Sequence, residues 1–185
     1  MKKLILSLVL FFGIVGASLF AWEPNDLTKF PSFTKEGDWI LNFGVGFGVP
    51  AFSGSGYIYF PPVRLSFDRN TTLGDRKLPF FFGGIVSYSG EGYSDDWFVS
   101  RISLGVRFGY HFNWGVDRLD TYAVTTAGWI IHAGKDYSSH FSGIGEPLYG
   151  VDVGARYFIS DGFGFWAEAG FGAVSFFNVG LSFKF

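Results

Sequence analysis

The chain has 185 residues and a formal net charge of −2 at pH 7, and 22% of its residues are aromatic whereas only 16% are charged. This balance excludes an ordinary water-facing surface and a basic surface that binds nucleic acid. The absence of cysteine excludes a disulfide framework and a lipid-modified N-terminal cysteine.

The beginning of the chain has the pattern of a signal peptide. A positively charged start is followed by an apolar run at 4–15 and by small residues at 16–18. We predict cleavage after Ala21, with Ala17 as the alternative, so that residues 1–21 form the signal peptide. A single transmembrane anchor is the competing interpretation, but the apolar run is short for a membrane span.

The next segment, residues 22–37, contains two prolines and no alternation of apolar and polar residues. We predict a periplasmic lead-in of little structure here, followed by a barrel domain at 38–185. Eight segments of that domain alternate with the period of two that is typical of β-strands. The predicted strands are residues 38–49, 57–68, 79–89, 97–112, 119–131, 148–159, 163–172 and 175–185.

These strands predict a closed membrane barrel. After the signal peptide the sequence has no continuous apolar stretch of about 18 residues, which a membrane-spanning helix would need. An open sheet in hydrocarbon would leave the backbone groups of its edges unsatisfied, so the sheet must close. The predicted fold is therefore all-β, an eight-stranded antiparallel transmembrane up-and-down β-barrel, with the even strand number of bacterial barrels.

Alternation alone does not say which face is inside, so a soluble ligand-carrying barrel of the lipocalin type is the alternative. Glycines repeat on the polar faces, as the crowded interior of a narrow barrel requires. Aromatic residues begin and end the apolar faces, as in the girdles at membrane interfaces. The predicted girdles are Trp39, Phe67, Phe80, Tyr110, Tyr122, Tyr157, Phe163 and Phe185 at one rim, and Phe47, Tyr59, Tyr88, Phe98, Tyr149, Phe171 and Phe177 at the other.

Two connections depart from a simple barrel pattern. Pro61 and Pro62 lie inside a predicted strand, where each removes a backbone donor, so we predict a bulge there or a strand that begins only at Val63. The link from Arg69 to Leu78 is long for the periplasmic side. The other periplasmic turns are predicted at 113–118 and 160–162, and the outer links at 50–56, 90–96, 132–147 and 173–174.

The last nine residues alternate without interruption and end on an aromatic residue. The large apolar residues of one face are Phe177, Val179, Leu181, Phe183 and Phe185. This segment, with the tight turn at 160–162, resembles the small outer-membrane β-barrel proteins of the OmpA, OmpX and OmpW type. The resemblance implies location in the bacterial outer membrane, contact with its lipids and lipopolysaccharide, and recognition of the closing strand by the barrel-assembly machinery. We expect a monomer.

The polar faces of the predicted strands carry the ionisable residues, and the outward positions carry none. The predicted interior set is Arg64, Asp68, Arg101, Arg107, His111, Asp152, Arg156, Glu168 and Lys184. An eight-stranded barrel is just wide enough to be filled by its own side chains, so these charges should pair and plug the lumen. A selectivity ring in a narrow channel is the alternative, but it needs a wider lumen.

The longest outer loop contains Ser142, His140 and Glu146, which could act as nucleophile, base and orienting acid. The stretch is similar to the His-x-Ser segment of outer-membrane lipid A deacylases, which implies Ser142 as nucleophile and His140 as base. It differs in Gly143, where that family has Asn, and in the closeness of Glu146. A polar surface loop is the interpretation that we prefer.

The sequence therefore predicts a structural or surface-interaction protein that binds an extracellular partner through its outer loops. A narrow channel for small solutes and a lipid A-modifying barrel enzyme are the alternatives. Three histidines without cysteine form no spacing typical of metal ligands, so we expect neither a metal nor a cofactor.

Overall fold

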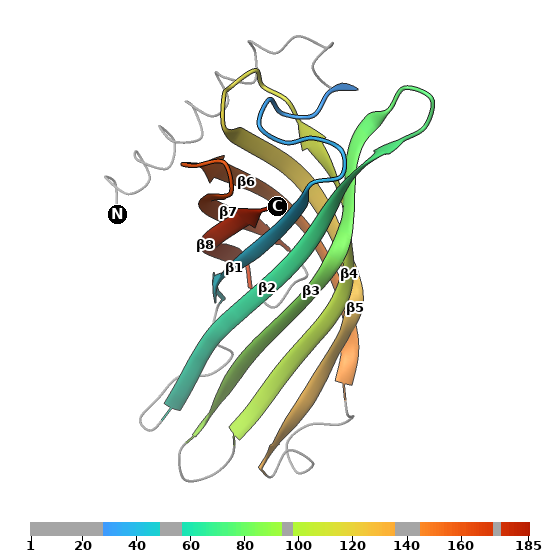
Figure 1. The fold of residues 1–185 in the computed structure, drawn as a ribbon. Coiled ribbons are helices and arrows are strands. Elements are labelled where there is room, and N and C mark those ends of the chain that lie inside the picture. Colours follow the sequence, from blue (N-terminus) through green and yellow to red (C-terminus); the bar gives the residue numbers. More distant parts are fainter. Residues whose placement is uncertain (1–27, 49–56, 94–97, 136–144, 172–174) are drawn as a thin grey trace, which may run out of the picture.

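A computed structural model describes residues 28–48, 57–93, 98–135, 145–171 and 175–185. In these ranges the chain forms eight β-strands that belong to one sheet (Figure 1). The strands are β1 (Trp39–Phe47), β2 (Tyr57–Leu73), β3 (Leu78–Tyr93), β4 (Phe98–Phe112), β5 (Leu119–Lys135), β6 (Gly145–Phe158), β7 (Phe163–Phe171) and β8 (Phe177–Lys184).

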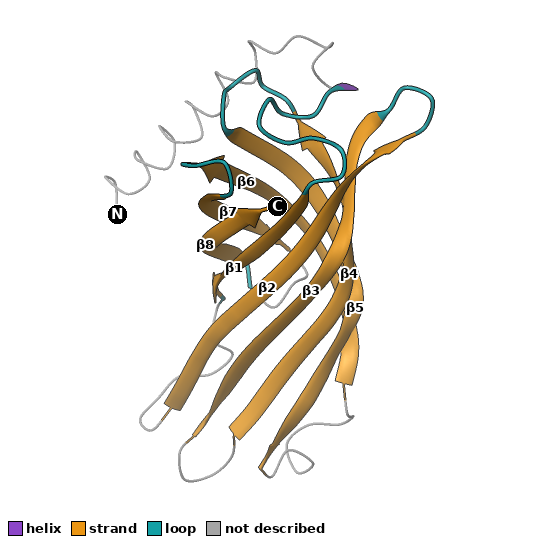
Figure 2. Ribbon diagram, viewed as in Figure 1, coloured by secondary structure: helices purple, strands orange, loops and turns teal. Residues whose placement is uncertain are grey.

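The sheet closes on itself (Figure 2). Each strand runs antiparallel to its neighbours in the chain, and β1 pairs with β8 in a register that sets Phe43 opposite Leu181. Strands that follow one another in sequence are also adjacent in space, which is an up-and-down topology. The prediction of an eight-stranded, closed antiparallel barrel is therefore confirmed.

The two ends of the barrel differ. β1 begins and β8 ends at the end that also carries the turn at 74–77, which we call the turn end; the opposite end is the loop end. The prediction of a long link from Arg69 to Leu78 was wrong, because β2 continues to Leu73. Gly74 in this turn has a φ of 73°, in the left-handed region that glycine adopts without strain.

The barrel wall has uneven height. β2 to β6 contain 14 to 17 residues each, whereas β1, β7 and β8 contain 8 or 9. In the described part of the chain, pairing between β1 and β2 ends with Val45 opposite Val63, so residues 57–62 continue beyond it. Figure 1 shows the long strands extending past the short ones at the loop end.

The predicted bulge at the two prolines is confirmed. The register between β2 and β3 shifts between Phe60 and Val63, and β2 continues through Pro61 and Pro62. An extra residue in one strand reverses which alternate side chains face inward. Tyr59 therefore faces the interior and lies opposite Glu91, so its prediction as part of the outer aromatic girdle was wrong.

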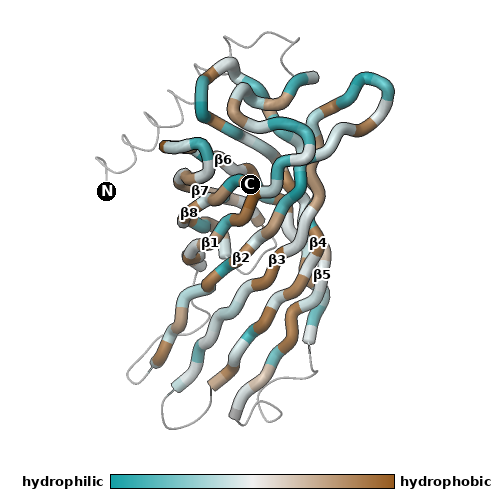
Figure 3. Tube along the Cα trace, in the orientation of Figure 1, coloured by the Kyte–Doolittle hydropathy of each residue, from teal (hydrophilic) through white to brown (hydrophobic). Residues whose placement is uncertain are grey.

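The outer surface of the barrel is apolar. Alternate residues along each strand point outward, and the large apolar side chains among them remain between about 40% and 77% exposed. Figure 3 shows hydrophobic and hydrophilic residues alternating along the strands. The outward apolar residues include Phe43, Phe67, Phe82, Leu104, Val106, Phe108, Trp129, Val151, Val153, Phe165 and Phe171. The polar face is the inner one, opposite to a barrel with an apolar ligand cavity.

The outward face carries a charge beyond the predicted strands, and one outward assignment was wrong. Arg69, which lies beyond the predicted end of its strand, is exposed on the outward face with its guanidinium 5.1 Å from the centre of the Trp39 ring. The outward face therefore carries a charge at the turn end. Tyr122 was predicted in a girdle but is 1% exposed inside the barrel. Its neighbours in sequence, Thr121 and Ala123, point to the other face of the strand. Because both are small, the sequence pattern indicated only weakly that they face outward.

The crowded interior predicts a contrast between two glycines. A Cβ at Gly154 would overlap the buried Tyr122 ring, whereas the nearest atom to a Cβ at Gly84 is 3.7 Å away. We expect Gly154→Ala to lower the free energy of unfolding by about 1 to 3 kcal/mol through overpacking. Gly84→Ala should be neutral or slightly stabilising. Urea titration of barrels refolded in detergent micelles measures both, and equal effects would contradict the packing described here.

Candidate functional site in the barrel interior

The interior of the barrel holds a cluster of charged side chains from five strands, which we call the central network. Its members are Arg64 and Asp68 on β2, Arg107 on β4, Asp120 on β5, Asp152 and Arg156 on β6, and Glu168 on β7, each at most 2% exposed. They lie at alternate positions because β-strands direct every second side chain inward. Burial at this level requires that the charges be paired.

Arg156 joins the network across the lumen. Its Nη1 donates to Asp120 Oδ2 at 2.9 Å, its Nη2 donates to Asp68 Oδ2 at 2.7 Å, and its Nε donates to Asn42 Oδ1 at 3.1 Å. The guanidinium also lies 4.1 Å from the centre of the Tyr122 ring. The planar fork of arginine thus uses all three nitrogens on partners from three strands.

Glu168 is the second centre of the network. It receives hydrogen bonds from Arg107 and from the hydroxyl of Tyr122, the latter at 2.7 Å, and the Nη2 of Arg64 lies 2.7 Å from its Oε2. Trp166 Nε1 in turn donates to the Tyr122 hydroxyl at 2.8 Å. Two arginines therefore share one carboxylate, and aromatic rings fill the space beside it.

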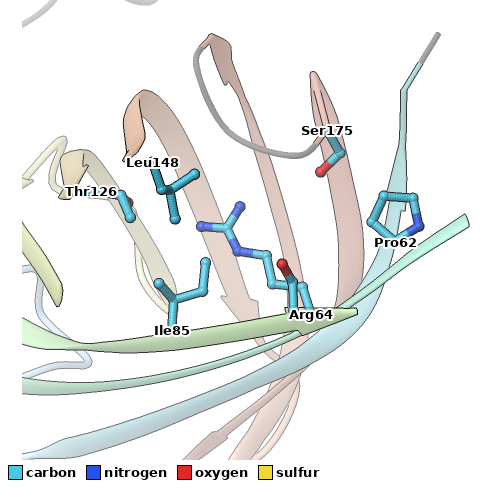
Figure 4. Close-up of a pocket in the computed structure, with 7 residues that line it drawn as sticks. Pro62, Arg64, Ile85, Thr126, Leu148 and Ser175 are labelled. Carbon is cyan, nitrogen blue, oxygen red and sulfur yellow. The ribbon is translucent and has the colours of Figure 1, made fainter. Parts of the chain in front are cut away.

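A small cavity adjoins Arg64 (Figure 4). It has a volume of about 10 Å³ and is lined by Pro62, Arg64, Ile85, Ser87, Thr126, Leu148 and Ser175. The Arg64 guanidinium, although ion-paired with Glu168, and the Thr126 hydroxyl have no hydrogen-bond partner among the described residues. A cavity of this size has room for a single water molecule and for nothing larger.

Two of the predicted interior charges lie outside the central network. Arg101 is 23% exposed towards the loop end and pairs with Glu91, which also accepts a hydrogen bond from the Tyr57 hydroxyl at 2.6 Å. Lys184 lies at the turn end, 3.9 Å from Asp38. Six other predicted members, Arg64, Asp68, Arg107, Asp152, Arg156 and Glu168, are brought together as described above. The ninth, His111, is buried beside the network, in contact with Asp120.

Sequence reasoning missed several interior residues. Asp120 was not proposed because Tyr122, two positions later, had been assigned outward, and the correct parity would have placed both inside. Glu91 was missed because the predicted strand ended at 89, whereas β3 extends to Tyr93. Asn42, which receives hydrogen bonds from Arg156 and Ser182, was assigned to the inner face but not to the site.

The segment at residues 28–38, which we call the N-terminal cap, covers the turn end of the barrel. Asn113 Nδ2 donates to the carbonyl of Phe30 at 2.9 Å, and Lys184 Nζ donates to the carbonyl of Phe33 at 2.6 Å. The Phe33 ring lies 5.1 Å from the ring of Phe158. The described part of the predicted lead-in contains no β-strand, yet these contacts hold it against the barrel.

The proposed catalytic residues are only partly visible. Ser142 and His140 lie outside the described residues. Glu146 is 59% exposed, with its Oε1 3.5 Å from Nε2 of His132. Within the described part of the chain no group of three or more histidine, cysteine, aspartate or glutamate residues could hold a metal ion.

The predicted assembly signal occupies the closing strand. Phe177, Val179, Leu181 and Phe183 alternate along β8 with Asn178 and Ser182, which are buried inside the barrel. Phe185, which is 71% exposed, exchanges two backbone hydrogen bonds with Trp39 at 2.9 and 3.1 Å. The chain terminus is therefore paired with the first strand.

No protein family model matches this chain, and a search among characterised proteins finds none with significant sequence similarity. None of the described residues belongs to a helix that is long and apolar enough to cross a membrane. The site must therefore be interpreted from its own geometry. That geometry is a lumen filled by paired charges and aromatic rings, with room for one water beside Arg64.

Proposed function

We propose that this chain is a bacterial outer-membrane protein whose barrel is plugged by its own side chains and whose loop end acts as a structural or surface-interaction element. One observation carries the proposal: the polarity of the barrel is inverted. Val106 and Val153 are 68% and 61% exposed on the outside, whereas Arg107 and Arg156 are at most 2% exposed inside. This inversion suits a hydrocarbon solvent and would be costly in water.

Several predictions from the sequence belong to the same proposal. They are a signal peptide at 1–21, insertion by the barrel-assembly machinery, and contact with outer-membrane lipids and lipopolysaccharide. Rings paired on the outside near the turn end, such as Trp39 with Phe67 at 4.7 Å and Phe80 with Tyr110 at 5.0 Å, suit an interfacial girdle. An extracellular partner would be bound through the loops at the loop end.

The filled interior favours a plug over a channel. Arg156 and Tyr122 reach across the lumen, and Phe81 and Trp166 pack around them with at most 2% exposure. A conducting path would require these side chains to separate, which would break several buried ion pairs together.

The proposal predicts a barrel that inserts but does not conduct. The full chain without residues 1–21, refolded with lipid vesicles, should resist extraction by alkaline carbonate and should remain electrically silent in a planar bilayer. Extraction with the soluble fraction would reject the membrane assignment. Steady single-channel currents would show that the barrel is a channel and not plugged. Loss of an acyl chain from the lipid A of expressing cells, abolished by Ser142→Ala, would show that the protein is an enzyme.

A further inference from the structure

His111 on β4 is held between two hydrogen-bond acceptors. It is 0% exposed, with Nδ1 2.6 Å from Asp120 Oδ1 and Nε2 3.0 Å from Asn70 Oδ1. The orientation of the Asn70 amide follows from its other contact, since Nδ2 donates to the carbonyl of Lys35 at 3.2 Å and a carbonyl can only accept. Both ring nitrogens of His111 must therefore carry hydrogen.

We propose that His111 is a buried imidazolium whose proton fastens the N-terminal cap to the barrel. The contacts run in one chain, from the Asp120 carboxylate through the His111 ring and the Asn70 amide to the Lys35 carbonyl in the cap. The ring of Phe30, also in the cap, packs 5.4 Å from the His111 ring. The cap thus senses the protonation of a residue inside the barrel.

The charge of the interior supports this assignment. The central network contains four carboxylates and three arginines, so it has one negative charge in excess. An imidazolium at His111, in contact with Asp120, balances the charges of the central network, as groups removed from water require.

The surroundings of His111 define how loss of the proton would act. Among titratable groups, Asp120 and Tyr122 face it from β5, and Arg156 on β6 binds the far side of the Asp120 carboxylate. β3 presents only the ring of Phe81, at 5.0 Å. A neutral ring that keeps its bond to Asp120 turns a lone pair towards Asn70 Oδ1, so the amide must rotate and release Lys35.

Cap release can be measured by thiol labelling, because the chain has no native cysteine. Thr34 in the cap is 4% exposed and its hydroxyl has no hydrogen-bond partner among the residues that the structure describes, so Thr34→Cys reports opening with little disturbance. Ser32→Cys, at an exposed position of the same segment, corrects for the higher reactivity of thiols at high pH. The readout is the maleimide-labelling rate of Thr34→Cys divided by that of Ser32→Cys, each measured in the refolded full chain.

We expect this ratio to rise about tenfold as the pH is raised, which corresponds to the loss of one buried hydrogen bond. The ratio should not change with pH when His111→Gln is added. A constant ratio in the parent protein, or the same rise with His111→Gln, would overturn the proposal.

Nitrogen NMR of the ring provides a measurement that does not require His111 to be replaced. His132→Gln with His140→Gln leaves His111 as the only histidine of the chain. We expect both ring nitrogens to be protonated while Thr34→Cys is protected, and the second proton to disappear over the pH range in which labelling accelerates. Protection that persists after this proton is lost would show that the proposal is wrong.

Discussion

Glu168→Gln is expected to destabilise the barrel by about 3 to 5 kcal/mol. The carboxylate of Glu168 compensates Arg64 and Arg107, which are at most 2% exposed, and it also accepts the hydroxyl of Tyr122. An amide removes the charge but keeps the shape, so the loss of stability measures two buried cations that have each lost one carboxylate partner. Urea titration of the refolded protein gives the free energy of unfolding.

The matched control is Glu146→Gln, the same chemical change at a carboxylate that is 59% exposed. Its effect should stay below about 1 kcal/mol, since exposed ion pairs contribute little. Adding Arg64→Met to Glu168→Gln should recover part of the lost stability by removing one uncompensated cation. Equal losses for the two glutamate variants would mean that the central network does not hold the interior together.

Val153→Arg is expected to destabilise the lipid-inserted barrel by about 2 to 4 kcal/mol. Val153 is 61% exposed on the outward face of β6, in the middle of the strand, where the proposed hydrocarbon layer would meet it. The cost arises because a guanidinium at this depth loses its water shell without gaining a partner. The free energy of unfolding is measured in lipid vesicles and in detergent micelles, and the two values are compared.

Leu73→Arg serves as the depth control. Leu73 is 53% exposed and ends β2 at the turn end, where an arginine can extend to the interface. Leu73→Arg should therefore destabilise the lipid-inserted barrel by only about 0 to 1 kcal/mol. If Val153→Arg were tolerated as well as Leu73→Arg in vesicles, the outward face would not lie in hydrocarbon, and the membrane assignment would fail.

The architecture could be predicted from the sequence because alternation is a local property that survives in every strand. The segment predicted at 163–172 is observed as β7 (Phe163–Phe171), and the closing strand at 175–185 as β8 (Phe177–Lys184). The loop-end extensions of β3 and β5 were missed, because glycine and serine between 89 and 92 weaken the apolar signal. Apolar patterning marks the proposed membrane band, not the full length of a strand.

Apart from Asp120, the members of the interior site were predictable, but their pairing was not. Inward parity identified Arg64, Arg107 and Glu168, because charged residues on an otherwise apolar barrel must face the lumen. Which carboxylate meets which arginine depends on strand tilt and on side-chain reach across the lumen, and a linear pattern contains neither. The cap was also beyond prediction, since its contacts are single carbonyl groups and ring faces that leave no periodic signal.

The uneven wall has a consequence for how molecules of this protein meet one another. Where β2 and β6 extend beyond the last pairs with β1 and β7, Val63 and Val151, the described residues provide no strand on their outer side. Free sheet edges recruit strands from other molecules and so begin aggregation. Both overhangs contain proline, Pro61 and Pro62 on β2 and Pro147 on β6, and proline has no N–H with which to bind an incoming strand. The long side of the barrel can therefore rise above the short side without offering a template for intermolecular sheet growth.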